Sequence, residues 1–118
     1  MNRITKFLQI ANKVRNESLM GIKVGAVVVK GSRAIKAACN ATGKPKFIGS
    51  WSRHAEVRAT LNINVKDADV YVYREHGIEK SPLLAKPCNH CIEWLQFVGV
   101  KRVVYSISEY PYFEEMSL

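Results

Sequence analysis

Residues 24–39 read VGAVVVKGSRAIKAAC, and this stretch decides the fold of the 118-residue chain. The segment Val24–Val29 is β-branched and almost continuously apolar, which is typical of a buried strand. The turn residues Lys30-Gly31-Ser32 follow, and Arg33–Cys39 continues as a second strand-like segment. Two such segments joined by a short turn that contains glycine predict a β-hairpin. The hairpin supplies one antiparallel strand pair to the expected sheet.

Helical periodicity precedes the hairpin. Apolar side chains recur at helical spacing over residues 2–19, and Gly21 follows as a helix stop. A polar loop is expected over residues 40–52, where glycine and proline interrupt the pattern. The remaining expected elements are helices over residues 53–61 and 88–98 and strands over residues 69–73 and 102–106.

The predicted order is therefore helix, hairpin, helix, strand, helix, strand. Strand–helix–strand units favour parallel pairing with right-handed crossovers. The sequence thus predicts an α/β protein, a three-layer α/β/α sandwich around a mixed sheet of four to five strands. Residues 74–87 are expected to be a polar loop, and the aromatic tail at residues 109–113 either caps a cleft or packs on the sheet. Sites in such folds lie at the carboxyl ends of strands, where the next helices begin.

Length and composition are those of an ordinary globular protein. Apolar residues make up 47% and charged residues 24% of the chain, and residues 1–118 are expected to form one domain. No stretch approaches the roughly 20 apolar residues that would cross a bilayer. Residues 1–6 show no signal peptide. We therefore expect an intracellular, cytoplasmic protein with no membrane partner.

Positive charge is concentrated in one half of the sequence. The formal net charge is +8, and residues 1–53 carry eleven Lys or Arg against a single acid, Glu17. Residues 54–118 carry seven Lys or Arg against nine acids. This asymmetry indicates an anionic partner such as a nucleotide phosphate or a nucleic acid, and a merely soluble basic surface is the alternative.

Two short motifs carry the chemistry. HAE, residues 54–56, is followed by PCNHC, residues 87–91, and 34 positions separate His54 from Cys88. Catalytic zinc takes three protein ligands and leaves one position open for water. Cys88 and Cys91 are three residues apart, so both sulfurs lie on one face of a helix start, where the helix terminus and the zinc favour the thiolate. We therefore predict a zinc site formed by His54, Cys88 and Cys91.

Glu56 gives this site a catalytic rather than a structural character. It is two positions from His54, so on a helix the two side chains point roughly 200° apart. That offset suits a carboxylate that flanks the metal-activated water without binding the metal. Such a carboxylate can take a proton from the water and pass it to a substrate nitrogen. A structural zinc site needs no such group.

This combination resembles the cytidine and deoxycytidylate deaminase superfamily, whose signature is H-x-E…P-C-x-x-C. The similarity covers about residues 1–106, and residues 84–88 and 103–105 look like small phage and bacterial members. The resemblance implies a cytidine deaminase-like fold and a Zn²⁺ cofactor. It also implies a hydrolase that converts a cytosine base to uracil and releases ammonia, with Glu56 protonating the ring.

Further substrate contacts are expected around the motifs. The resemblance implies that Asn40 contacts the sugar, that the backbone N–H of Ala55 contacts the base, and that the carbonyl of Lys86 receives the exocyclic amine. An ordinary turn residue is the alternative for Asn40. In the basic loop, Trp51 could stack on a base and Arg53 could hold phosphate, against the alternatives of packing and simple solvation.

Three functional hypotheses stay open. The first is cytosine deamination in a free nucleotide of the deoxycytidylate or cytidine type, or in single-stranded DNA or RNA. The second is adenine deamination in RNA, which shares both motifs. The third is a zinc-stabilised nucleic-acid-binding module without catalysis, against which Glu56 argues. The chain ends about a dozen residues after its last expected strand, so we also consider a homo-oligomer that completes the site by self-association.

Overall fold

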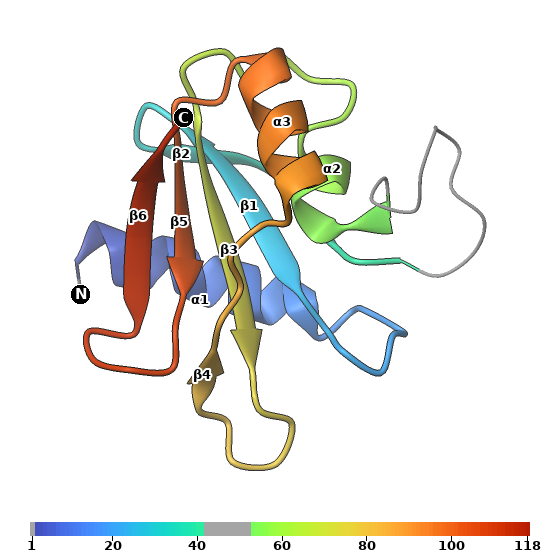
Figure 1. Cartoon of the computed structure of the whole chain (residues 1–118), viewed down its shortest axis with the longest axis vertical. Coiled ribbons are helices and arrows are strands. Elements are labelled where there is room, and N and C mark those ends of the chain that lie inside the picture. Colours follow the sequence, from blue (N-terminus) through green and yellow to red (C-terminus); the bar gives the residue numbers. More distant parts are fainter. Residues whose placement is uncertain (1, 42–52) are drawn as a thin grey trace.

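In the computed structural model, which describes residues 2–41 and 53–118, the predicted hairpin forms one side of a six-stranded sheet (Figure 1). The strand order is β2-β1-β3-β5-β6, and β4 pairs with β3 outside this path. The elements are α1 (Arg3–Arg15), β1 (Gly25–Lys30), β2 (Arg33–Cys39), α2 (Ala55–Ala59), β3 (Asp69–Glu75), β4 (Pro82–Leu83), α3 (Asn89–Val98), β5 (Arg102–Ser106) and β6 (Phe113–Ser117).

The sheet is mixed, as the sequence predicts. β3 and β5 are parallel, and α3 lies on the crossover between them. The remaining strand pairs are antiparallel, including the β1–β2 hairpin. Because β2 and β3 both run antiparallel to β1, their carboxyl ends lie at the same edge of the sheet.

Helices cover both faces of the sheet because the side chains of its central strands alternate between two cores. Val27 and Val29 pack with Phe7 of α1 on one face. Ala26 and Val28 pack on the other face, in the cluster that also holds residues of α2 and α3. α1 crosses one side of the sheet, and α2 and α3 lie on the other (Figure 1). The predicted three-layer α/β/α architecture is confirmed.

The first helix ends earlier than the sequence suggests. α1 begins after Asn2, whose side chain accepts a hydrogen bond from the Thr5 N–H at 2.8 Å, and it ends at Arg15 rather than at residue 19. Beyond it, the Ser18 hydroxyl donates to the Asn40 carbonyl at 3.1 Å, so the chain turns toward β2 instead of continuing the helix. In the described ranges, no helix is both long and apolar enough to span a bilayer.

Two strands lie where the sequence suggested none. β4 falls inside the expected loop 74–87 and pairs antiparallel with the last residues of β3, and β6 pairs antiparallel with β5. The prediction of four to five strands was therefore too low. β4 has only two residues, and β6 reads FEEMS with adjacent glutamates. Neither segment shows the alternation that identifies a half-buried strand, because each is specified by its partner strand rather than by its own pattern.

The contact between α1 and β1 requires glycine at position 25. A Cβ atom on Gly25 would lie 1.9 Å from the Ala11 carbonyl oxygen and 2.8 Å from the Arg15 amide nitrogen, both of them backbone atoms of α1. Neither atom can move unless the whole helix shifts. The substitution Gly25→Ala is therefore expected to lower the free energy of unfolding by about 3 kcal/mol or more, as measured by denaturant unfolding.

Gly21→Ala is the matched control for this substitution. A Cβ atom at Gly21 meets nothing within 4 Å, so its effect should stay within about 1 kcal/mol. Equal stability of the two variants would contradict the close approach of α1 to β1.

Candidate active site

The two motifs lie at the starts of α2 and α3. His54 occupies the N-cap position of α2, and Cys88 occupies the N-cap position of α3. Both have extended backbone conformations and neither side chain caps its own helix, so both remain available for a ligand. Cys91 follows one turn later in α3 and is fully buried. The two helix starts converge at the edge of the sheet where β2 and β3 end.

The three predicted metal ligands lie together. The Nδ1 atom of His54 is 3.1 Å from Cys91 Sγ and 3.7 Å from Cys88 Sγ, and the two sulfurs are 3.3 Å apart. Zn–S bonds of about 2.3 Å and Zn–N bonds of about 2.0 Å, at tetrahedral angles, place such ligand atoms about 3.5–3.8 Å apart. The observed separations lie within about half an ångström of that geometry. One nitrogen and two sulfurs at these distances form a donor set that fits Zn²⁺.

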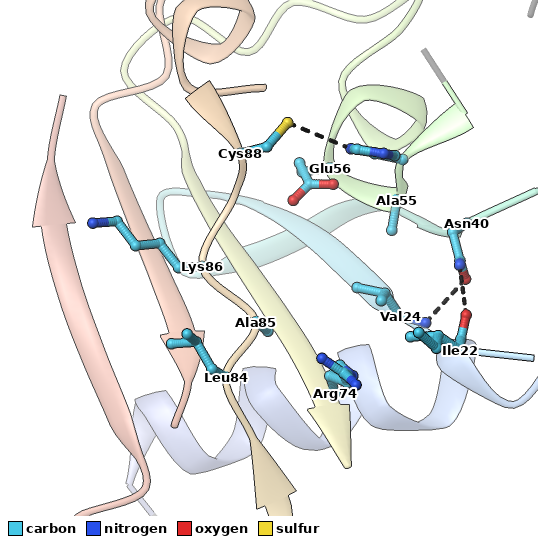
Figure 2. A pocket seen from close by; sticks show the side chains of 11 residues that line it. Ile22, Val24, Asn40, Ala55, Glu56, Arg74, Leu84, Ala85, Lys86 and Cys88 are labelled. Carbon is cyan, nitrogen blue, oxygen red and sulfur yellow. Dashed lines mark hydrogen bonds between the residues drawn. The ribbon is translucent and has the colours of Figure 1, made fainter. Parts of the chain in front are cut away.

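Glu56 lies beside this cluster and is almost completely buried, with 5% of its surface exposed. Figure 2 shows its carboxylate between Cys88 and Ala55. Burial raises the pKa of Glu56 to about 7, although hydrogen bonds from its own backbone N–H and from Cys91 act in the opposite direction. A carboxyl group whose pKa is close to neutral can both accept and release a proton, as a proton shuttle must.

The protonation of the ligands also depends on burial. Burial, followed by the charge of Arg53, lowers the pKa of His54, so the imidazole stays neutral and can bind a metal. Burial raises the pKa of Cys91, and the charge of Glu56 and the hydrogen bond with Cys88 act in the same direction. A divalent cation at this point would oppose these effects, because it stabilises the thiolate.

A hydrogen-bonded link holds the two helices in register. The Trp94 indole N–H, from α3, donates to the Thr60 hydroxyl at 2.9 Å. The same hydroxyl lies 3.0 Å from the Glu56 carbonyl and 2.9 Å from the Val57 carbonyl, both in α2. Thr60 is buried, so this link is protected from water. It fixes the spacing between the helix that carries Glu56 and the helix that carries Cys91.

A cavity of about 280 Å³ opens next to the cluster. Cys88 forms one end of it, and the segment 84–86 forms a side wall (Figure 2). His54 also lines the cavity, with its Nδ1 atom 3.7 Å from Cys88 Sγ. Arg74 lies at the end far from Cys88. The cavity therefore brings together the beginning of α2, the segment before α3 and the end of β3.

The three substrate residues implied by the resemblance line this cavity. Ala55 is fully buried at its wall, and Lys86 lines it from an exposed position. Asn40 also lines it, but its side chain is already hydrogen-bonded (Figure 2). Its Oδ1 accepts from the Val24 N–H at 2.9 Å, and its Nδ2 donates to the Ile22 carbonyl at 2.7 Å. Asn40 thus shapes the wall by holding the segment before β1.

Arg53, one of the two residues expected from the basic loop, does not line this cavity. Arg53 is half-buried, its carbonyl accepts from the Ala41 N–H at 3.0 Å, and it acts on His54 through its charge. Trp51 lies outside the described residues.

Sequence reasoning missed the far end of the cavity. Arg74, Ile22 and Leu84 all line it, and none belongs to a motif. Arg74 was assigned to the polar loop 74–87, but β3 continues through Glu75 and places it in the sheet. The sequence did contain an indication of this position. Side chains alternate between the two faces of a strand, and Arg74 is an even number of residues from the core residues Val70 and Val72, so it lies on the same face.

Residues 1–107 match the family model described as the cytidine and deoxycytidylate deaminase zinc-binding region. No curated relative matches the chain by sequence.

Several solved structures share the fold. A dCMP deaminase from the cyanophage S-TIM5 is similar with a TM-score of 0.63 and 21% identity, over 88% of this chain and 82% of that one. A cytidine deaminase from Burkholderia pseudomallei gives a TM-score of 0.68 and 18% identity, over 96% and 91%. A diaminohydroxyphosphoribosylaminopyrimidine deaminase/reductase from Thermotoga maritima gives a TM-score of 0.56 and 22% identity. The match includes 92% of this chain but 31% of that protein.

The ligand assignment predicts which cysteines retain the metal. Cys88→Ser and Cys91→Ser should each weaken zinc binding more than about 100-fold, because each removes one of three protein ligands. Zinc content after gel filtration, together with competition against a chromophoric chelator, measures the loss. Cys39→Ser is the matched control, since Cys39 lies outside the cluster, and it should keep its zinc. Equal zinc loss in all three variants would contradict the assignment.

Proposed function

The chain belongs to the cytidine and deoxycytidylate deaminase family, and we propose on this premise that it is a zinc-dependent hydrolytic deaminase that converts a cytosine base to uracil. The observation that carries the proposal is the position of Glu56. This carboxyl group is buried beside three metal-ligating side chains and lines the cavity next to them. A zinc site with a purely structural role gives no reason to bury an ionisable group that binds no metal.

Glu56 moves the protons of the reaction. Zinc held by His54, Cys88 and Cys91 would lower the pKa of a water molecule and so supply the nucleophile at neutral pH. Glu56 accepts the proton that this water loses and delivers it to the ring nitrogen beside the amine-bearing carbon. The water oxygen forms a bond to that carbon, its second proton passes to the amine, and the carbon–nitrogen bond breaks as ammonia leaves. Water and cytosine thus give ammonia and uracil, and Glu56 ends in its starting state.

The cavity walls orient the base. The N–H of Ala55 belongs to the first turn of α2, where backbone N–H groups have no partner within the helix, and it donates to the base. The carbonyl of Lys86 accepts from the exocyclic amine. The fully buried Ala55 and the nearly buried Ala85 exclude water around the base, which strengthens these hydrogen bonds.

Replacing Glu56 separates catalysis from metal binding. Glu56→Gln and Glu56→Ala should each lower kcat by about 10²–10⁴-fold or more while zinc content is unchanged, because proton transfer is lost and all three ligands remain. Glu93→Gln is the matched control, since Glu93 is an exposed acid on α3. The assay measures the one-dalton mass gain of the product by mass spectrometry.

The substrate panel contains cytidine, deoxycytidylate, and single strands that contain cytosine or adenine. Conversion of cytosine but not adenine is expected. Loss of zinc in Glu56→Gln would instead make Glu56 a ligand and contradict its role. A zinc-loaded protein that converts nothing in the panel would favour a binding module.

A further inference from the structure

A second cavity adjoins the first at the end of β3. Its volume is about 320 Å³, and it lies between the segment that follows α1 and the β3–β4 hairpin. Ile22 and Arg74 line both cavities, so Arg74 stands at the boundary between them. The catalytic motifs contribute no residue to this second space.

Positive charge dominates the lining of the second cavity. Arg15, Lys23, Arg74 and Lys80 contribute four cations, and Glu75 is the only acid that lines it within the described chain. The Glu75 carboxylate already has two partners, because it pairs with Arg15 at 3.2 Å and accepts a hydrogen bond from the Tyr73 hydroxyl at 3.0 Å. Among the described residues that line this cavity, no second acid is present to pair with the other cations.

Arg74 differs from Arg15 and Arg102, the other arginines of α1 and of the sheet that are at least partly buried. Arg15 pairs with Glu75, and Arg102 pairs with Asp69 and Glu115. Arg74 is half-buried, yet its guanidinium forms no ion pair or hydrogen bond with any residue of the described chain. Lys23 is likewise half-buried, and it forms no ion pair with any described residue. Partly desolvated cations without a counter-ion mark a place where an anion is stabilised.

The backbone around both cations is fixed. The Arg74 N–H donates to the Ser106 hydroxyl at 3.1 Å, and that buried hydroxyl donates to the Leu83 carbonyl at 2.7 Å. Lys23 lies between Ile22 and Val24, the two residues that the Asn40 side chain holds. An anion that enters this space therefore meets charges whose backbone is already ordered, which lowers the entropic cost of binding.

We propose that the second cavity is an anion subsite, in which Arg74 and Lys23 bind the phosphate group attached to the sugar of the target nucleotide. The inference rests on the proposed function, since it places the base in the first cavity and its phosphate beyond Arg74. The cavity volumes agree with this division. The first cavity, about 280 Å³, is just below the range of roughly 300–1,000 Å³ typical of small-molecule sites, and the two together lie well inside it. The selected substrate is thus a nucleotide rather than a nucleoside.

The test compares substrates that differ only in phosphate. Zinc-loaded protein is assayed with deoxycytidine, with deoxycytidine monophosphate, and with a single-stranded oligonucleotide that contains one cytosine. In Arg74→Gln, the ratio of kcat/KM for the monophosphate to kcat/KM for deoxycytidine should fall about 10- to 100-fold, because a charged hydrogen-bond partner of the phosphate is lost. If the phosphate belongs to a strand, the same fall appears in the oligonucleotide ratio.

A structural role of Arg74 would lower all three rates together and leave both ratios unchanged, which overturns the proposal. Arg33→Gln is the control with the same change of charge, because Arg33 is exposed at the opposite end of the sheet, and its ratios should match the wild type. Arg74→Lys should recover part of the lost ratio, because it keeps the charge without the planar fork. Lys23→Gln tests the same subsite should Arg74→Gln fail to fold.

A binding measurement with inorganic phosphate tests this inference independently of the proposed function. If the wild-type protein converts none of the three substrates, the proposed function fails, and calorimetric titration with inorganic phosphate then decides the inference. Wild type and Arg33→Gln should bind phosphate, and Arg74→Gln should bind it at least about 10-fold more weakly. Equal affinity of the two variants, or no binding to the wild type at millimolar phosphate, overturns it.

Discussion

Burial of the central strands on both faces of the sheet is the constraint on which the rest of the structure depends. β1 and β3 present alternate side chains to two apolar cores, so neither strand can hold a charged group along its middle. Polar chemistry is therefore restricted to the ends of the strands, where the helices of the next layer begin. His54, Cys88 and Arg74 all lie at the edge where β2 and β3 end, although 34 positions separate the first two in sequence.

The same burial determines the electrostatics of the metal cluster. Glu56 and Cys91 are both buried, and burial raises the pKa of each. The cost of placing two acidic groups side by side is offset when a divalent cation lies between the sulfurs and the imidazole. The hydrogen bonds from Trp94 through Thr60 to α2 keep the two helices from separating. Metal binding and helix packing thus stabilise one another.

The parts of the site that were predictable from sequence are those with strict local spacing. Two cysteines one helical turn apart, and a glutamate two positions from a histidine, indicate a metal site and a proton carrier whatever the rest of the chain does. The hairpin was predictable for a similar reason, because its strands and turn are contiguous. β4 and β6 were missed since each is stabilised mainly by the strand beside it. Arg74 was missed because the case for it depends on the absence of an ion pair to its guanidinium among the described residues, which no local pattern reveals.

Asn40 has a structural role that the resemblance did not imply. A contact with the sugar stays a prediction, and both polar ends of its side chain hold the backbone at Ile22 and Val24. Those two residues flank Lys23, so Asn40 acts on the cavity that contains Lys23 as well as on the cavity it lines. Ser106 has the equivalent effect on Arg74, because its hydroxyl accepts from the Arg74 N–H. Two uncharged side chains thus order the backbone of the two cations before any ligand arrives, which lowers the entropic cost of binding an anion at this end of the sheet.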